Sequence, residues 1–145
     1  MPRSPSTEPE QFIVFVDRCL GRGEVAGALR AEGVQVEIHD DHFANDCADE
    51  VWLREVGARG WVVVTKDKYI RRRPKERRAL EDANVAAFVL TAGGINGAEM
   101  AQVFVAALHR IRRISATYTR PLIAIVQRGG TVHVLLGERR GGVRR

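Results

Sequence analysis

The stretch FIVFVD, residues 12–17, decides the fold of this 145-residue chain. It is an uninterrupted apolar run that ends at a carboxylate, which is typical of a strand buried on both faces of a parallel sheet. A second stretch, WVVVTKD at 61–67, has the same character, because an apolar run again leads to an aspartate. Here Thr65 and Lys66 stand between the run and the aspartate. Residues with helical spacing separate the two stretches, so we expect strands and helices to alternate.

The rest of the chain continues this alternation. We predict helices over 24–32, 48–59, 75–83 and 97–114. We predict further strands over 34–38, 85–90, 122–127 and 131–136. Pro74 can begin the third helix, Asn96 can cap the fourth, and the turn at 128–130 predicts a hairpin between the last two strands. The sequence therefore predicts an α/β protein with a mostly parallel sheet covered by helices on both faces.

Length and composition favour one globular domain over 12–137, preceded by a disordered, Pro-rich arm at 1–11 and followed by a flexible basic tail at 138–145. No apolar run approaches the ~20 residues that cross a bilayer, so no membrane segment is expected. The two cysteines, Cys19 and Cys47, are too few for a disulfide framework, and the cytoplasm is the expected location. The net charge of +5 suggests a polyanionic partner.

Several aspartates follow predicted strands: Asp17, the pair Asp40 and Asp41, and Asp67. Because right-handed crossovers place the carboxyl ends of parallel strands along one rim, we expect these side chains to gather there. Neighbouring carboxylates repel each other, and a divalent cation between them relieves the repulsion. Hard oxygen ligands favour Mg²⁺ or Mn²⁺. The alternatives are structural, since Asp17 could cap a helix and Asp67 could be a turn residue paired with lysines.

Two further acidic segments lie near this predicted rim. In Asp46-Cys47-Ala48-Asp49-Glu50, Asp46 fits the N-cap of the next helix, and either Asp49 or Glu50 is a candidate metal ligand. In His39-Asp40-Asp41-His42, Asp40 or Asp41 is a weaker candidate, because adjacent residues on an extended segment point in opposite directions.

A basic run begins beside Asp67. The side chains expected to bind phosphate are Lys66, Lys68, Arg71, Arg72 and Arg73, and the run continues through Lys75, Arg77 and Arg78. A nucleic-acid backbone that reached the predicted metal site would pass these cations. The alternative is a solvated surface in which Glu76 and Glu81 neutralise part of the charge.

Taken together, VDRCLG, HDDHF, WLREVG and TKDKYIRRRP, with the acid of DEVWL, resemble the PIN-like nucleases over residues 12 to about 114, and in particular the branch of VapC-type toxins. The resemblance implies a three-layer α/β/α fold, a Mg²⁺ or Mn²⁺ cofactor, and RNA cleavage. It implies catalytic roles for Asp17, for Asp49 or Glu50, and for Asp67. This chain departs from related motifs in having Arg18 and Cys19 after Asp17, and Tyr69 where a second acid follows the T-x-D motif. Asp40 or Asp41 would then complete the ligand set, and the hairpin at 122–136 is not explained by the resemblance.

The expected function is therefore a Mg²⁺- or Mn²⁺-dependent ribonuclease, the toxin of a toxin–antitoxin pair, with RNA as substrate, an antitoxin as partner, and a homodimer as the expected assembly. The alternative is a catalytically weak PIN-like module that binds RNA or an antitoxin. A phosphoacceptor domain of receiver type is disfavoured because Asp17 is single and LIAIVQ (122–127) ends without a lysine. A haloacid-dehalogenase-type phosphatase is disfavoured because Asp17-Arg18-Cys19 lacks its D-x-D motif.

Overall fold

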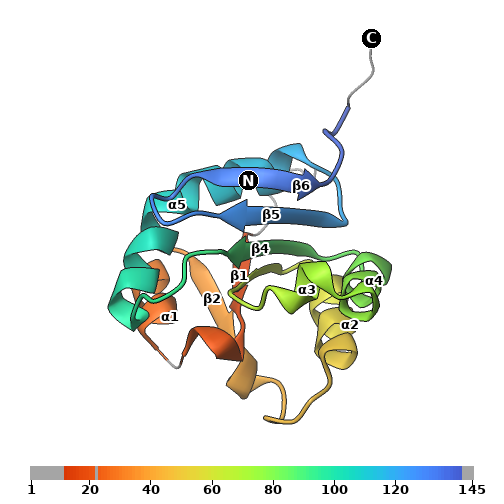
Figure 1. The fold of residues 1–145 in the computed structure, drawn as a ribbon, viewed down its shortest axis with the longest axis horizontal. Helices are drawn as coiled ribbons and strands as arrows, with labels where there is room; N and C mark the ends of the chain where they lie inside the picture. Colours follow the sequence, from red (N-terminus) through yellow and green to blue (C-terminus); the bar gives the residue numbers. More distant parts are fainter. Residues whose placement is uncertain (1–11, 22, 142–145) are drawn as a thin grey trace, which may run out of the picture.

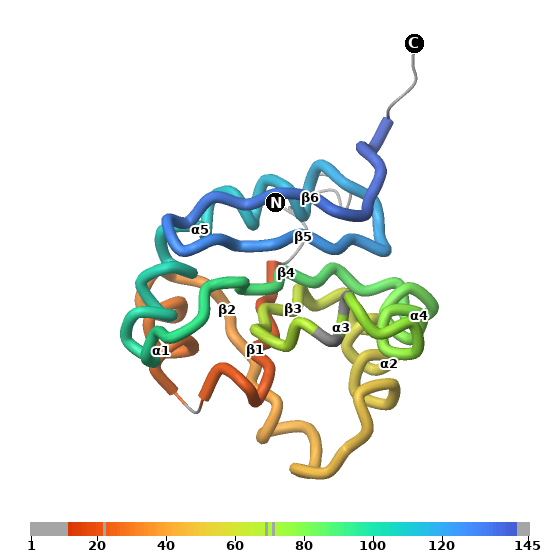
Figure 2. The backbone as a smooth tube through the Cα atoms, viewed as in Figure 1, coloured from red at the N-terminus to blue at the C-terminus, as the bar shows by residue number. Residues whose placement is uncertain are grey.

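A computed structural model describes residues 12–21 and 23–141, with only the backbone described at Tyr69 and Arg71. A six-stranded sheet runs through the molecule in the order β2-β1-β3-β4-β5-β6. Figure 1 shows the sheet together with the helices of the molecule, and Figure 2 shows the paths of β1 and β3 next to each other at the centre. The strands are β1 (Ile13–Val16), β2 (Gln35–Ile38), β3 (Val62–Thr65), β4 (Ala86–Leu90), β5 (Leu122–Val126) and β6 (Val132–Leu136).

All neighbouring strands from β2 through β5 pair in parallel, and only β5 and β6 are antiparallel. β6 returns along β5 after the turn at residues 127–131, where Gly130 has a φ of 90° that glycine adopts without steric cost. Parallel pairing places the carboxyl ends of β1, β2, β3 and β4 at one edge of the sheet. The mostly parallel sheet and the C-terminal hairpin predicted from the sequence are confirmed.

Helices cover both faces of the sheet and form three layers (Figure 1). One face packs against α1 (Glu24–Ala31) and α5 (Gly97–Thr117). The other packs against α2 (Asp49–Arg59), α3 (Tyr69–Arg72) and α4 (Pro74–Asp82). Short 3-10 turns, η2 (Arg18–Leu20) and η3 (His39–Asp41), follow β1 and β2 directly.

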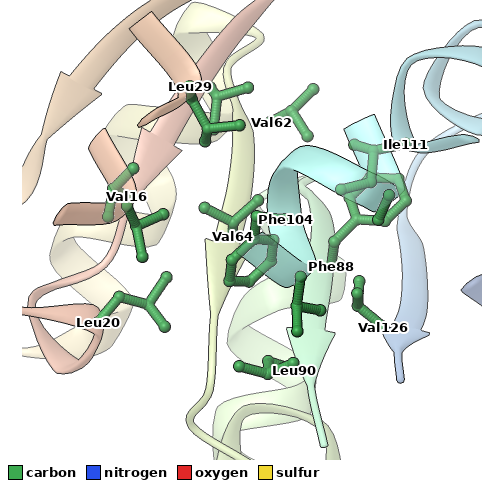
Figure 3. Close-up of a cluster of buried hydrophobic side chains, with 14 of the residues drawn as sticks. Val16, Leu20, Leu29, Val62, Val64, Phe88, Leu90, Phe104, Ile111 and Val126 are labelled. Atoms are coloured by element: carbon green, nitrogen blue, oxygen red, sulfur yellow. The ribbon is translucent and has the colours of Figure 1, made fainter. Parts of the chain in front are cut away.

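Each inner strand contributes to both cores because successive side chains point to opposite faces. The even-numbered residues of β1 and β3, including Val16, Val62 and Val64, pack with Phe104 and Ile111 of α5 on the face shown in Figure 3. The odd-numbered residues, such as Phe15 and Val63, pack on the other face with α2. This explains the unbroken apolar runs of the sequence. It also places Asp17, two residues after Phe15, in phase with the α2 side.

Several element boundaries differ from the sequence-based expectation. The prediction of Asp46 as the N-cap of α2 is wrong, because Ala48 occupies that position and makes no side-chain cap. The short helix α3 and the turns η2 and η3 were not predicted, since segments this short carry no periodic signal. The prediction that Asn96 caps α5 is confirmed, and the structure adds a capping box in which Asn96 and Glu99 bond reciprocally at 2.8 Å.

The chain after β6 folds back on the end of α5. Backbone N–H groups of Thr119 and Arg140 donate to the carbonyl oxygens of Glu138 and Thr117, each at 2.7 Å. Residues 142–145, the rest of the expected tail, and the expected arm at 1–11 lie outside the described residues. None of the helices in the described parts of the chain is long and apolar enough to cross a membrane.

Helix α2 approaches the turn before β4 closely at Gly57. A Cβ atom built at Gly57 would overlap the carbonyl oxygen of Ala83 and crowd Val85. Glycine is therefore required here for the close approach, and it fixes how deeply α2 packs against the chain that leads into β4.

Candidate active site at the carboxyl edge of the sheet

Asp17 lies at the carboxyl end of β1 and is almost fully buried, with 8% of its surface exposed. Its backbone N–H donates to the carbonyl oxygen of Val64 at 3.1 Å, so the residue is still held by the neighbouring strand β3. A buried carboxylate is costly unless it is hydrogen-bonded or close to a cation. Asp17 therefore has a defined position and an unusual environment, and both features are typical of a functional acid.

Thr65, the last residue of β3, connects Asp17 to the segment that follows β3. Its buried hydroxyl donates to Asp17 Oδ2 at 2.7 Å and accepts from the backbone N–H of Asp67 at 3.0 Å. One side chain thus fixes the Asp17 carboxylate and the first turn after β3. Sequence reasoning did not assign a role to Thr65, although its place in the T-x-D motif was the available signal.

Cys19 completes this network from the turn η2. Its Sγ lies 3.1 Å from Thr65 Oγ1 and 3.5 Å from Asp17 Oδ2, and it accepts from the backbone N–H of Lys66 at 3.4 Å. Burial and the nearby Asp17 carboxylate raise the pKa of the Cys19 thiol to about 12. Cys19 is therefore a neutral thiol at physiological pH and acts here as a hydrogen-bonding group.

Asp49 approaches the same site from the first residue of α2. The Asp49 carboxylate is held by the indole N–H of Trp52, which donates to Oδ1 at 2.9 Å. Burial raises the pKa of Asp17, the hydrogen bonds from Thr65 and Cys19 lower it, and repulsion from Asp49 raises it. Asp17 and Asp49 are therefore close enough to influence each other electrostatically, although they are separated by more than thirty residues in the sequence.

Glu50, the alternative to Asp49, has a different environment. Its side chain is exposed and lines a groove of about 180 Å³ between α2 and α4, together with Asp49, Lys75 and Glu76. Of this acidic pair, Asp49 is the residue whose carboxylate raises the pKa of the buried Asp17. Of the two alternatives that the sequence left open, the geometry favours Asp49.

Asp67 lies two residues beyond the end of β3, half-buried, on the turn that Thr65 holds. Asp17, Asp49 and Asp67 thus belong to neighbouring elements at one edge of the sheet. They do not form a ready-made cluster, because across the described ranges no three His, Cys, Asp or Glu side chains gather closely enough to hold a metal ion. Binding a cation between these three acids would require rotation of at least one side chain.

The residues present nonetheless fit a hard divalent cation. The donors are carboxylate oxygens, Asp17 is buried with a raised pKa, and part of that rise comes from a second carboxylate. A cation between such a pair removes both the repulsion and the cost of burying the charge. Oxygen donors of this kind favour Mg²⁺ or Mn²⁺ over zinc.

The segment after β2 contributes less than expected. Asp40 is paired with Arg18, whose Nε lies 3.2 Å from Oδ1, while Asp41 is exposed and forms no hydrogen bond or ion pair with another described residue. His39 is buried against Phe15 and Trp52, and its Nδ1 has no hydrogen-bond partner among the residues that the structure describes. His39 is therefore part of the aromatic core beneath the site.

The basic run surrounds this edge from β3 to α4. Lys66, Lys68, Arg72 and Arg73 are exposed, and the side chain of Arg71 is not described. Arg77 is paired with Glu81 at 2.9 Å. Within the described part of the chain, the cations that form no ion pair include Lys66, Arg72, Lys75 and Arg78. A second groove, of about 400 Å³, continues the first and is lined by Lys75, Arg78 and Glu50 among others. Unpaired cations thus extend from the acidic residues along α4.

Comparison with known proteins identifies the family. A family model described as "PIN like domain" matches residues 12–92, more than half of the chain. The chain belongs to the PIN-like family. It is 31% identical over 126 residues to a Mycobacterium tuberculosis protein named "Putative ribonuclease VapC45", and the match covers 84% of this chain and 91% of that protein. No solved structure matches it.

Every residue of the candidate site lies within the matched range. Thr65 ends β3, Asp17 and Asp67 follow β1 and β3, and Asp49 begins α2. The PIN-like segment alone therefore supplies all four residues. Helix α5 and the β5–β6 hairpin lie beyond it and complete one core and one edge of the sheet. The resemblance inferred from the sequence motifs is confirmed.

Proposed function

We propose that this PIN-like protein is a ribonuclease that depends on Mg²⁺ or Mn²⁺ and hydrolyses phosphodiester bonds within RNA. The observation that carries the proposal is the buried Asp17 carboxylate, which is held by Thr65 and repelled by Asp49. A fold gains nothing from such a pair unless a positive charge joins it, and a divalent cation, which can also bind an RNA phosphate, supplies that charge.

Asp17, Asp49 and Asp67 would hold the cation, and Asp41, which forms no ion pair with another described residue, is the proposed further acid. When bound, a divalent cation activates water and stabilises the charge that develops on the phosphate during in-line displacement. The protein's own residues prepare the site. Thr65 and Cys19 hold Oδ2 of Asp17, and their hydrogen bonds favour the ionised carboxylate that a cation requires.

We propose that RNA reaches the site along the basic run from Lys66 to Arg78, with contributions from Lys68 and Arg71 to Arg73. Four cations that form no ion pair among the described residues support this path: Lys66, Arg72, Lys75 and Arg78. Cations that have no acidic partner can bind phosphates and release counterions without first breaking an ion pair. Base preference would depend on contacts to unstacked bases.

The name of the M. tuberculosis relative supports a biological role as a toxin neutralised by an antitoxin. We propose this role for the present chain, with the cytoplasm as its location and a homodimer as its assembly. Light scattering of the purified protein with and without a coexpressed antitoxin would test the assembly, and a monomer in both samples would contradict it.

The enzymatic proposal is tested by cleavage of a labelled single-stranded RNA with Mn²⁺ and with excess chelator. Asp17→Asn and Asp49→Asn should each abolish cleavage, because each removes a charged donor from the proposed site. Glu55→Gln is the matched control on α2, where Glu55 pairs with Arg59 at 2.7 Å. Full cleavage by the Asp17 variant, or by wild type in chelator, would refute the proposal. RNA binding without any cleavage by wild type would favour the alternative of a binding module.

A further inference from the structure

Trp52 is held rigidly beneath the candidate site. It is 2% exposed, its ring stacks on Phe15 of β1 with centroids 5.4 Å apart, and it makes a T-shaped contact with the ring of His39 at a centroid distance of 5.9 Å. Phe15 lies two residues before Asp17 on the same strand and points to the same side of the sheet. The position of the Trp52 ring is therefore fixed relative to Asp17.

The polar atom of this buried ring is directed at Asp49. Indole Nε1 can only donate, and it donates to Asp49 Oδ1 at 2.9 Å from one helical turn away. Asp49 is the first residue of α2, where the N-cap Ala48 has no side chain that could hold the helix end. One Asp49 oxygen is thus tied to a rigid donor, and the carboxylate has lost most of its rotational freedom.

Glu50 provides the internal comparison. It lies one residue further along α2, is exposed, and its side chain forms no hydrogen bond or ion pair with any other residue that the structure describes. A ligand that is already oriented binds a cation with a smaller entropic cost than a mobile side chain. Residues that hydrogen-bond to metal ligands typically contribute 10–100-fold to metal affinity.

We propose that Trp52 is the positioning residue that orients Asp49 toward Asp17 for divalent-cation binding, and that it thereby selects Asp49 over Glu50 as a ligand. This inference rests on the proposed function. The alternative role for Trp52 is purely structural, in which the indole fills the core and Asp49 merely satisfies its N–H group. The two roles predict different couplings between Trp52 and Asp49.

The experiment measures Mn²⁺ affinity by the loss of free-ion electron paramagnetic resonance signal, without RNA. Trp52→Phe keeps an aromatic ring on Phe15 and removes the donor, so affinity should fall about 10-fold. Trp61→Phe is the matched control, because Trp61 also stacks on Phe15, at 6.0 Å, and its indole donates to no acid among the described residues. Trp61→Phe should change affinity less than twofold.

The decisive comparison is made in an Asp49→Asn background. If Trp52 acts through the Asp49 carboxylate, Trp52→Phe should cause no further loss of Mn²⁺ affinity there. An equal loss in both backgrounds, or equal losses from the Trp52 and Trp61 variants, would overturn the positioning role. If Trp52→Phe does not fold, as judged by circular dichroism, benzothienylalanine at position 52 removes the N–H group and keeps the ring size.

Fluorescence gives a second measurement on the same protein. The chain has two tryptophans, so Trp61→Phe leaves Trp52 as the sole indole emitter. Its emission should change on titration with Mn²⁺, and the change should disappear when Asp49 is replaced by Asn. If wild type binds no Mn²⁺ at all, the proposed metal dependence fails together with this inference. If wild type binds and Asp17→Asn does not, only the result for Trp52 decides the positioning role.

Discussion

Replacing Thr65 by valine tests the hydrogen-bond network that holds Asp17. Valine has nearly the same shape as threonine, so the change removes the hydroxyl at a fully buried site without leaving a cavity. The lost bond to the Asp17 carboxylate contributes about 1.5–3 kcal/mol when the acceptor is charged. The Asp67 N–H loses its acceptor as well, at a cost of about 1 kcal/mol because that residue is half-buried and can reach water.

We therefore expect Thr65→Val to lower the free energy of unfolding by roughly 2.5–4 kcal/mol, out of the ~5–15 kcal/mol typical of a single domain. Thr65→Ser is the control, since it keeps the hydroxyl and loses one methyl group, at about 1 kcal/mol. Urea denaturation at pH 7 in the presence of chelator measures both variants without a contribution from bound cations. Equal stability of the two variants would mean that the hydroxyl does not stabilise the fold.

The same variant has a predictable effect on the pH dependence of cleavage. The Thr65 hydrogen bond lowers the pKa of Asp17, so its removal raises that pKa. The acidic limb of the pH–rate profile should then move to higher pH in Thr65→Val and remain in place in Thr65→Ser. An unshifted limb in the valine variant would contradict a role for Thr65 in keeping Asp17 ionised.

Further predictions concern Asp17, Cys19 and the cations of α4. Burial raises the pKa of Asp17 above 3.8, so the stability that its protonated form provides is fully present below that pH and is lost as the pH rises through the folded pKa. In calorimetry, Asp17→Asn should therefore melt at a higher temperature than wild type at pH 7, and this difference should shrink toward pH 4. A difference that stays constant with pH would argue against this linkage. The pKa of the Cys19 thiol is about 12 instead of 9.0, which makes the thiolate fraction about 1000-fold smaller. Iodoacetamide should therefore modify Cys19 only after the protein is unfolded in urea. Rapid labelling of Cys19 in the folded chain would disprove the shift. Replacing Lys75 and Arg78 together by Ala should reduce the slope of log K against log salt concentration for single-stranded RNA binding by about 1.4. Arg77→Ala should change this slope much less, because Arg77 is paired with Glu81. Equal effects of the two replacements would count against the proposed path.

Much of the fold could be predicted from β1 and β3, because strands buried on both faces leave an unbroken apolar run that few other structures produce. The candidate acids could be predicted for the same reason, since Asp17 follows β1 directly and Asp67 lies two residues beyond β3. Their arrangement could not, because it depends on rotamers and on hydrogen bonds between residues distant in sequence. The bond from Thr65 to Asp17 joins residues 48 positions apart, and no local pattern reports it.

The roles of the acidic residues at the start of α2 also could not be predicted from the sequence. All three candidates at this position are acidic, namely Asp46, Asp49 and Glu50. The sequence also allows the helix to begin at any of several residues. The structure begins it at Asp49, which brings Trp52 one turn later into the core and its N–H onto the carboxylate. A shift of the helix start by one residue would have favoured a different acid.

The position of Asp49 depends on Gly57, which lies further along the same helix. About 12 Å of helix separates Gly57 from Asp49, at 1.5 Å per residue. A helix of this length moves as a stiff rod, so a side chain that pushed one end away from Ala83 would tilt the other end with it. The placement of an acid at the sheet edge thus depends on a hydrogen atom in place of a methyl group two helical turns away.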